Sequence, residues 1–211
     1  MSLAINIAIP LPAAVTDEVI RLNGQLDEQP NPVPLAAHEA IAHLTLAMGV
    51  IDDEALQPLI DRLTHDLRYE TNFTIHLKGI YQRTLGDGRV VCGIDTVQHS
   101  QLQKLHETVM DAFVDAGFQV SHMGALYDYK NADPFTLRLI QFFKDECTYD
   151  TYFPHITLGV GSMLGEARLA VNSFEVNRVE IFHMGSLCTA RKALQAFSLR
   201  QKEELAFGGL D

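Results

Sequence analysis

The chain has 211 residues, of which 47% are hydrophobic and 20% are charged. This length favours one domain or two interleaved lobes with a sizeable core, and the apolar content excludes a disordered chain. The 27 acidic side chains outnumber the 16 basic ones, and the formal net charge of −11 argues against a surface that binds long nucleic acids. Three cysteines without C-x-x-C spacing predict reduced thiols and a cytoplasmic location.

The N-terminal third begins with an apolar run. Residues 3–9 predict a buried strand that ends at Pro10, rather than an export signal, because no Lys or Arg precedes Arg21. No apolar run approaches the roughly 20 residues of a membrane span, so we expect no membrane contact. The apolar spacing of 15–26 predicts a helix, and the three prolines within 27–34 predict a loop.

Strand and helix patterns then alternate. Period-2 alternation predicts a strand over 42–50, and helical spacing follows over 56–67. Residues 73–82 and 89–94 read as two strands of a hairpin, joined through the turn 86–88. An amphipathic helix is predicted over 101–116 and ends at Gly117.

The C-terminal half is less regular. Asp133-Pro134 resembles a helix start, which predicts a helix to about Cys147, and strands are expected over 153–160, 174–184 and 194–200. Short strands with a few long helices, repeated in two halves, indicate an α+β fold with mostly antiparallel sheets. Because no flexible linker is evident, we predict a single domain over 1–211.

Two of the expected strands begin with the same pattern, His43-Leu44-Thr45-Leu46 and His155-Ile156-Thr157-Leu158. On a strand, each His and Thr point to one face, about 7 Å apart, and the apolar residues point to the other. A third triplet, His106-Glu107-Thr108, lies in the middle of a predicted helix, where residues two apart diverge by about 200°. We interpret this third triplet as part of a solvated helical face.

Two such units facing each other suit attack on a phosphodiester. One neutral imidazole can take a proton from water or a hydroxyl group, and a protonated one can donate to the leaving oxygen. The two hydroxyls can donate hydrogen bonds to the non-bridging oxygens, and no metal is required. His38 and His43 are spaced i, i+5 and cannot share a zinc ion on a helix. The alternative interpretation is that His43 and His155 are structural, half-buried strand residues.

The two motifs resemble the paired signatures of the two-histidine phosphoesterase superfamily, which includes the bacterial 2'-5' RNA ligase/RNA 2',3'-cyclic phosphodiesterase family. INIAIPLP resembles the opening strand of that family, FTIHLKGI followed by RVVCGIDT its central hairpin, and LQKLHETVMDAFVDAGF its second long helix. Phe153-Pro154 before the second motif matches the aromatic-Pro segment that often precedes it. The resemblance spans most of residues 3–200.

This resemblance implies a two-lobed α+β fold with pseudo-twofold symmetry, in which two antiparallel sheets flank a central groove and helices lie outside. It also implies that His43, Thr45, His155 and Thr157 are catalytic. We therefore predict a metal-independent cyclic phosphodiesterase without a cofactor, acting in RNA processing on a 2',3'-cyclic phosphate of a small nucleotide or RNA terminus. The alternatives are 2'-5' RNA ligation and a non-catalytic module that binds a nucleotide or phosphoryl ligand.

One departure from the family pattern is the long, aromatic-rich stretch between Gly117 and His155, which predicts an extra packed helix or a lid-like insert over 121–152 that stacks on a base. Arg83 and Arg191, near predicted strand ends, and Phe153 are the candidates for substrate binding. The acidity of the chain disfavours a long RNA but is compatible with a single phosphate held by hydroxyls and one imidazolium.

Overall fold

The computed structural model describes residues 1–36 and 39–202, and in them eight strands form one curled, antiparallel sheet in the order β6-β3-β4-β5-β2-β1-β7-β8. The strands are β1 (Ser2–Pro10), β2 (His43–Asp52), β3 (Phe73–Thr84), β4 (Val90–Thr96), β5 (His155–Val160), β6 (Ser173–Val176), β7 (Arg178–Met184) and β8 (Ala190–Ser198). The helices are α1 (Ala13–Asn23), α2 (Leu56–Leu67), α3 (Ser100–Asp115) and α4 (Phe135–Glu146). The predicted α+β class is confirmed.

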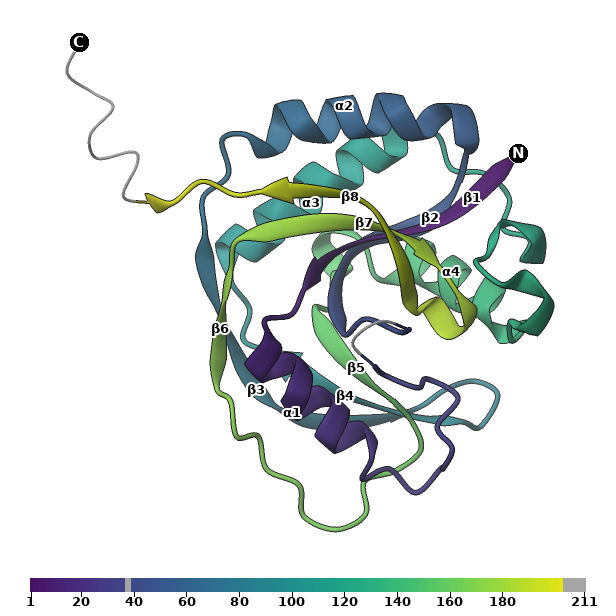
Figure 1. Ribbon diagram of the computed structural model, residues 1–211, viewed down its shortest axis with the longest axis vertical. Coiled ribbons are helices and arrows are strands. Elements are labelled where there is room, and N and C mark those ends of the chain that lie inside the picture. Colours follow the sequence, from purple (N-terminus) through teal and green to yellow (C-terminus); the bar gives the residue numbers. More distant parts are fainter. Residues whose placement is uncertain (37–38, 203–211) are drawn as a thin grey trace.

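The sheet consists of two four-stranded halves that meet between β2 and β5. These two strands pair through Leu44 and Ile156 alone, whereas the neighbouring strands in each half pair over longer ladders. Figure 1 shows the two halves curving toward each other around the central strands. The predicted arrangement of two antiparallel sheets in two lobes is confirmed, with the sheets joined along this short contact.

Helices α1, α2 and α3 cover the outer faces of the two halves, whereas α4 lies on the cavity side. The apolar face of α1 packs against β5, while α3 packs against β2, and α2 packs against α3 and β8. In Figure 1, α2 and α3 lie over one half and α1 lies over the other. Amphipathic spacing explains these contacts, since the buried residues of α2 recur every four positions at Leu59, Leu63 and Leu67. Within the described residues, no helix is long and apolar enough to cross a membrane.

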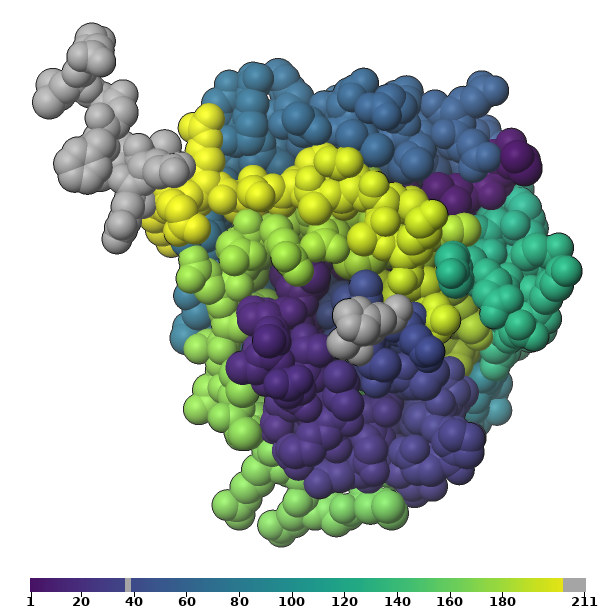
Figure 2. Space-filling view, in the orientation of Figure 1, coloured from purple at the N-terminus to yellow at the C-terminus, as the bar shows by residue number. Residues whose placement is uncertain are grey.

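The segment after α1 closes one end of the molecule. The amide of Asp27 donates to the carbonyl oxygen of Ser162 at 2.9 Å, and the amide of Leu164 donates to that of Gln25 at 3.0 Å. The space-filling view shows this purple N-terminal segment lying against the light-green chain that follows β5 (Figure 2). The loop predicted over 27–34 is thus held to the β5 side of the sheet.

The single strand predicted over 174–184 is wrong. The chain pairs with β3 as far as Val176 and then pairs with β1 from Glu180 onward, so two strands, β6 and β7, lie in different halves. Asn177 stands between them, and its carbonyl accepts the amide of Leu199 at 2.8 Å. Two consecutive exposed residues, Asn177 and Arg178, interrupt the alternation here, and the buried positions change from 174 and 176 to 179 and 181. The sequence therefore contains a local signal of the break that the prediction of one strand overlooked.

The helix predicted from Asp133-Pro134 to about Cys147 is confirmed as α4. The Asp133 carboxylate accepts the amide of Phe135 at 2.8 Å at the helix start. The same carboxylate forms an ion pair with Arg89, the residue just before β4, with 2.5 Å between Oδ2 of Asp133 and Nη1 of Arg89. This ion pair fixes the start of α4 to the predicted hairpin, which is confirmed as β3 and β4.

Candidate active site

The two His-x-Thr motifs lie side by side where the halves of the sheet meet. His43 and His155 begin β2 and β5, and the antiparallel pair Leu44–Ile156 stands between the motifs. This register places His43 beside Thr157, and Thr45 beside His155. Leu44 and Ile156 are fully buried on the other face, so all four polar side chains point into one cleft.

A β-bulge follows the threonine in each motif. In the β1–β2 ladder Ala8 pairs with Thr45 and Ile7 with Ala47, so Leu46 is the extra residue. In the β4–β5 ladder the same shift leaves Leu158 as the extra residue, between Thr157 and Gly159. The two bulges occupy equivalent positions in the two motifs, as pseudo-twofold symmetry requires.

A side chain from an outer helix binds the carbonyl at each bulge. His106 of α3 places Nδ1 2.7 Å from the Leu46 oxygen. Asn23 of α1 donates from Nδ2 to the Leu158 oxygen at 2.6 Å. Because a bulge leaves its extra residue outside the ladder, these bonds satisfy backbone groups that would otherwise be buried without partners. The helices therefore hold the backbone of each motif from behind.

His43 is held by its own strand and by β1. Its Nδ1 lies 2.7 Å from the carbonyl oxygen of Ile41, and its Nε2 lies 3.1 Å from Nδ2 of Asn6. The same Asn6 nitrogen donates to the Thr45 hydroxyl at 3.2 Å. Burial lowers the pKa of His43, and the nearby His155 lowers it further, against the opposing effect of the Ile41 carbonyl.

His155 lies among aromatic rings. Its Nδ1 lies 2.8 Å from the carbonyl oxygen of Phe153, and the Phe153 ring stacks on the imidazole with centroids 5.3 Å apart. Tyr81 of β3 contacts it edge to face at 5.9 Å. Burial lowers the pKa of His155 and Arg83 adds to this, while the Phe153 carbonyl and Asp95 raise it.

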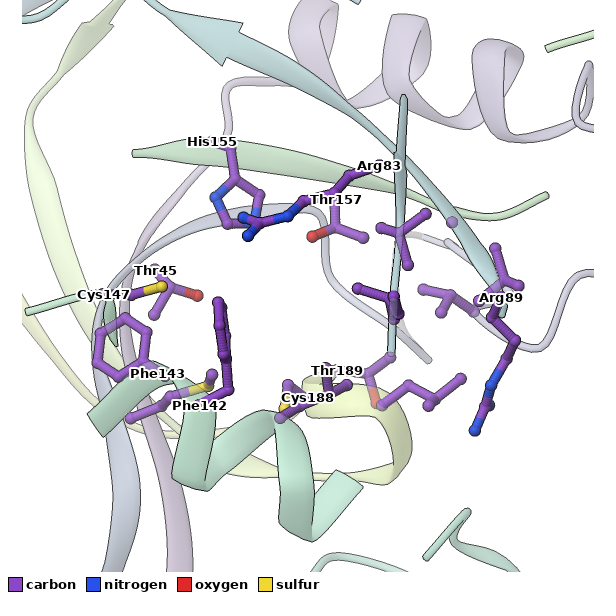
Figure 3. Close-up of a pocket in the computed structure, with 18 of the residues that line it drawn as sticks. Thr45, Arg83, Arg89, Phe142, Phe143, Cys147, His155, Thr157, Cys188 and Thr189 are labelled. Carbon is purple, nitrogen blue, oxygen red and sulfur yellow. The ribbon is translucent and has the colours of Figure 1, made fainter. Parts of the chain in front are cut away.

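Both motifs open into a cavity of about 500 Å³. Figure 3 shows His155 and Thr157 on one side of it and Thr45 on another, with Phe142 and Phe143 of α4 closing the opposite wall. Its lining is mostly apolar or aromatic and includes Val33, Leu35, Ile41, Tyr81, Leu85, Val91, Phe135, Leu139, Phe142, Phe143, Tyr152, Phe153 and Leu187. The cavity therefore offers a polar floor, where the motifs lie, under apolar walls.

Of the residues predicted to bind substrate, Arg83 and Phe153 line this cavity and Arg191 does not. The Arg83 guanidinium lies beside His155 (Figure 3) and 5.4 Å from the Phe142 ring centroid. Within residues 1–36 and 39–202, Arg83 has no acidic partner, whereas the cavity residue Arg89 is paired with Asp87 and Asp133. Arg191 instead lies over the Tyr127 ring, 5.7 Å from its centroid.

In the described part of the chain no three His, Cys, Asp or Glu side chains converge as metal ligands. His38, from the spacing that the sequence excludes as a zinc motif, lies outside the described residues.

The interpretation of His106 as part of a solvated helical face is wrong. The side chain is fully buried, its Nε2 accepts the Tyr149 amide at 2.8 Å, and its ring stacks on Tyr152 at 3.8 Å. The Tyr152 hydroxyl in turn donates to the Thr45 carbonyl at 2.7 Å. Helical periodicity contains the signal, because 106 shares a face with 102, 109 and 113. Asn6 is the one polar residue in the apolar run 3–9, but only the pairing of β1 with β2 shows that it lies at His43.

Solved structures share this fold. LigT of E. coli in its apo form matches with a TM-score of 0.62 and 18% identity, over 95% of this chain and 99% of that chain. The E. coli LigT structure complexed with 3'-AMP matches with a TM-score of 0.63 and 20% identity, over 94% of this chain and 99% of that chain. A protein of Thermus thermophilus matches with a TM-score of 0.61 and 18% identity, over 95% of this chain and 100% of that chain. The architecture is therefore that of the LigT-like phosphoesterases.

The family follows from the sequence itself. The model of the 2'-5' RNA ligase superfamily matches residues 12–182, a span that contains both motifs, and the chain belongs to this superfamily. The resemblance to the two-histidine phosphoesterases is confirmed, and with it an enzyme class that acts on phosphodiester bonds. A search of curated protein sequences gives no significant match.

Proposed function

We propose that the protein is a metal-independent cyclic phosphodiesterase that hydrolyses a 2',3'-cyclic phosphate, or a related cyclic phosphodiester, of a small nucleotide or RNA terminus. One imidazole takes a proton from water as the water oxygen forms a bond to phosphorus. The second imidazole, protonated, donates its proton to the 2' or 3' oxygen as the bond from phosphorus to that oxygen breaks. The hydroxyls of Thr45 and Thr157 donate to the non-bridging oxygens, where negative charge increases.

The single observation that carries this proposal is the register of β2 and β5, in which the side chains of both His-x-Thr units point into the same cleft. In both histidines Nδ1 lies against a backbone carbonyl, at 2.7 Å for His43 and 2.8 Å for His155. Because a carbonyl can only accept, Nδ1 carries a hydrogen in each ring and Nε2 is the atom that exchanges protons. In the proposed mechanism these two Nε2 atoms act as acid and base on opposite sides of one phosphorus.

The size and lining of the cavity support a small substrate. A volume of about 500 Å³ suits a nucleotide or a chain end, and its aromatic walls can stack on a base. LigT has been crystallised with 3'-AMP, with ATP and with phosphate. Arg83 and Phe153 are the proposed contacts to phosphate and base, and segment 121–152 is proposed to act as a lid through the α4 wall.

The test is a screen of the four nucleoside 2',3'-cyclic phosphates and a short RNA with a cyclic end, in the presence of EDTA. We expect turnover that survives the chelator and falls by a factor of about 10² to 10⁴ in His43→Ala and in His155→Ala. The exposed His65 on α2 provides the control, because His65→Ala should keep full activity. A wild-type protein that binds these compounds without turnover would instead be the binding module, and activity in the double histidine variant would exclude the mechanism.

A further inference from the structure

Asn6 is an unusual residue for its position. It lies in the middle of β1, its side chain is fully buried, and its chain neighbours Ile5 and Ile7 are fully buried too. A buried amide is costly unless its polar atoms find partners, and the apolar pattern of this central strand calls for a hydrophobic side chain here. The contacts of the amide therefore explain why an asparagine stands at this position.

The Asn6 nitrogen meets both polar groups of the first motif. Its Nδ2 lies 3.1 Å from Nε2 of His43, 3.2 Å from Oγ1 of Thr45 and 3.5 Å from the carbonyl oxygen of Cys188. Oδ1 of the same amide is buried and has no hydrogen-bond partner within the described residues. The amide thus uses its donors on the site and leaves its acceptor without a partner.

This geometry fixes hydrogens on the groups that the amide touches. Because Nδ1 of His43 donates to Ile41, a neutral His43 has its lone pair on Nε2, and that lone pair accepts from Asn6. The Thr45 oxygen accepts from the same amide, so its own hydrogen is available for a substrate oxygen. A protonated His43 would place an N–H against the N–H of Asn6, and the amide therefore favours the neutral ring.

We propose that Asn6 is a positioning residue that keeps the His43 imidazole neutral and the Thr45 hydroxyl aimed at the substrate, so that His43 is the base of the reaction and His155 the acid. This assignment rests on the proposed function, whereas the effect of Asn6 on His43 does not. Nε2 has a single lone pair, so the attacking water replaces the Asn6 N–H at Nε2 before its proton moves to His43, while the amide keeps its hydrogen bond to Thr45.

The other groups around His43 do not fix the protonation state of its ring as Asn6 does. His155 on β5 is the charged group that acts on His43, and Arg83 on β3 acts on His155 rather than on His43. Cys188, in the short helix η5 (Ser186–Cys188), also lines the cavity, but burial raises the pKa of its thiol to about 12 and keeps it neutral. No carboxylate in the described part of the chain opposes the amide at this ring.

The first experiment is an NMR titration of the His43 ring in the wild type, in Asn6→Asp and in Asn6→Leu. A carboxylate facing Nε2 stabilises the imidazolium, so we expect Asn6→Asp to raise the pKa of His43 by about one unit or more. Wild-type His43 should be the Nδ1–H tautomer when neutral. An unchanged His43 titration in Asn6→Asp would overturn the proposal.

The second experiment measures kcat and kcat/KM against pH in the same proteins. If His43 is the base, Asn6→Asp moves the acidic limb to higher pH, and if the alkaline limb moves instead the base assignment is wrong. Asn6→Leu keeps the number and branching of the side-chain heavy atoms and removes a buried unpaired oxygen, so we expect an equal or higher melting temperature with kcat at least about tenfold lower. A lower melting temperature with unchanged kcat would show a merely structural asparagine.

The two experiments separate this inference from the proposed function. The NMR titration requires no turnover, so it decides the effect of Asn6 even if no cyclic phosphate is hydrolysed. If the enzyme is active but the His43 titration is the same in the wild type and the Asn6 variants, the proposed function stands and the role of Asn6 is refuted. Circular dichroism of each variant establishes that it is folded before either measurement is interpreted.

Discussion

Replacing His106 with leucine tests how strongly α3 supports the first motif. The change removes two buried hydrogen bonds, one to the Leu46 carbonyl at 2.7 Å and one from the Tyr149 amide at 2.8 Å, and the stacking on Tyr152 at 3.8 Å. A buried group left unpaired costs about 1–3 kcal/mol, and lost stacking about 0.5–1.5 kcal/mol. Leucine recovers part of the loss by apolar burial. We therefore expect the free energy of unfolding to fall by about 3 kcal/mol.

The assay is urea unfolding at pH 7.5 together with turnover under native conditions. His65→Leu, on the exposed face of α2, is the control and should change the free energy of unfolding by less than about 0.5 kcal/mol. Turnover by folded His106→Leu should also fall, because Tyr152 loses the ring that orients its bond to the Thr45 carbonyl. A free energy within about 1 kcal/mol of the wild type would refute the role given to His106.

The same residue predicts a pH dependence. Burial lowers the pKa of His106 in the folded protein, so the unfolded chain binds the proton more readily. The stability that the neutral ring contributes is then complete above the ordinary histidine pKa of about 6.5 and is lost as the pH falls below it. His43 and His155 shift in the same direction and add to the slope. His106→Leu should therefore lose stability less steeply than the wild type between about pH 7 and 5, and parallel slopes would contradict this account.

Two further variants address the second motif. In Gly93→Ala the new methyl would lie 2.6 Å from Cε1 of Tyr81, the ring that contacts His155, so we expect the free energy of unfolding to fall by about 1–3 kcal/mol and turnover to fall as well. Gly79→Ala on β3 is the matched control, because a methyl group there meets nothing within 4 Å. Equal behaviour of the two variants would count against the Tyr81 contact. Arg83→Gln removes the cation that lowers the pKa of His155, so the limb of the pH profile that reports His155 should move to higher pH. We also expect KM to rise about tenfold or more, because the side chain no longer offers a charge to the phosphate. An unchanged pH profile with the wild-type KM would show that Arg83 does not act in the site.

Local patterns carried most of the sequence-based prediction, because strands, helices and the same-face geometry of each motif depend on residues close in the chain. The hairpin, α4 and both motif strands were predicted in this way. The role of Asn6 depends on which strand lies beside β1, and the bulge at Leu46 depends on the register of that pairing. Both features are set by long-range pairing, which a single sequence does not display. The break at Asn177 differs, because two consecutive polar residues, Asn177 and Arg178, interrupt the apolar alternation and mark it locally, although the change of partner strand is itself long-range.

The strand order also constrains how the molecule is completed during synthesis. One half of the sheet, β3 to β6, comes from the continuous stretch 73–176, while the other half joins β1 and β2 to β7 and β8 from the opposite end of the chain. The first strand made, β1, therefore has no partner on its outer side until β7 leaves the ribosome, whereas the first motif on β2 lies between β1 and β5. In that interval the apolar β1 is an unpaired edge, open to pairing with another chain. The second motif, made more than a hundred residues later, belongs to the half that can close first.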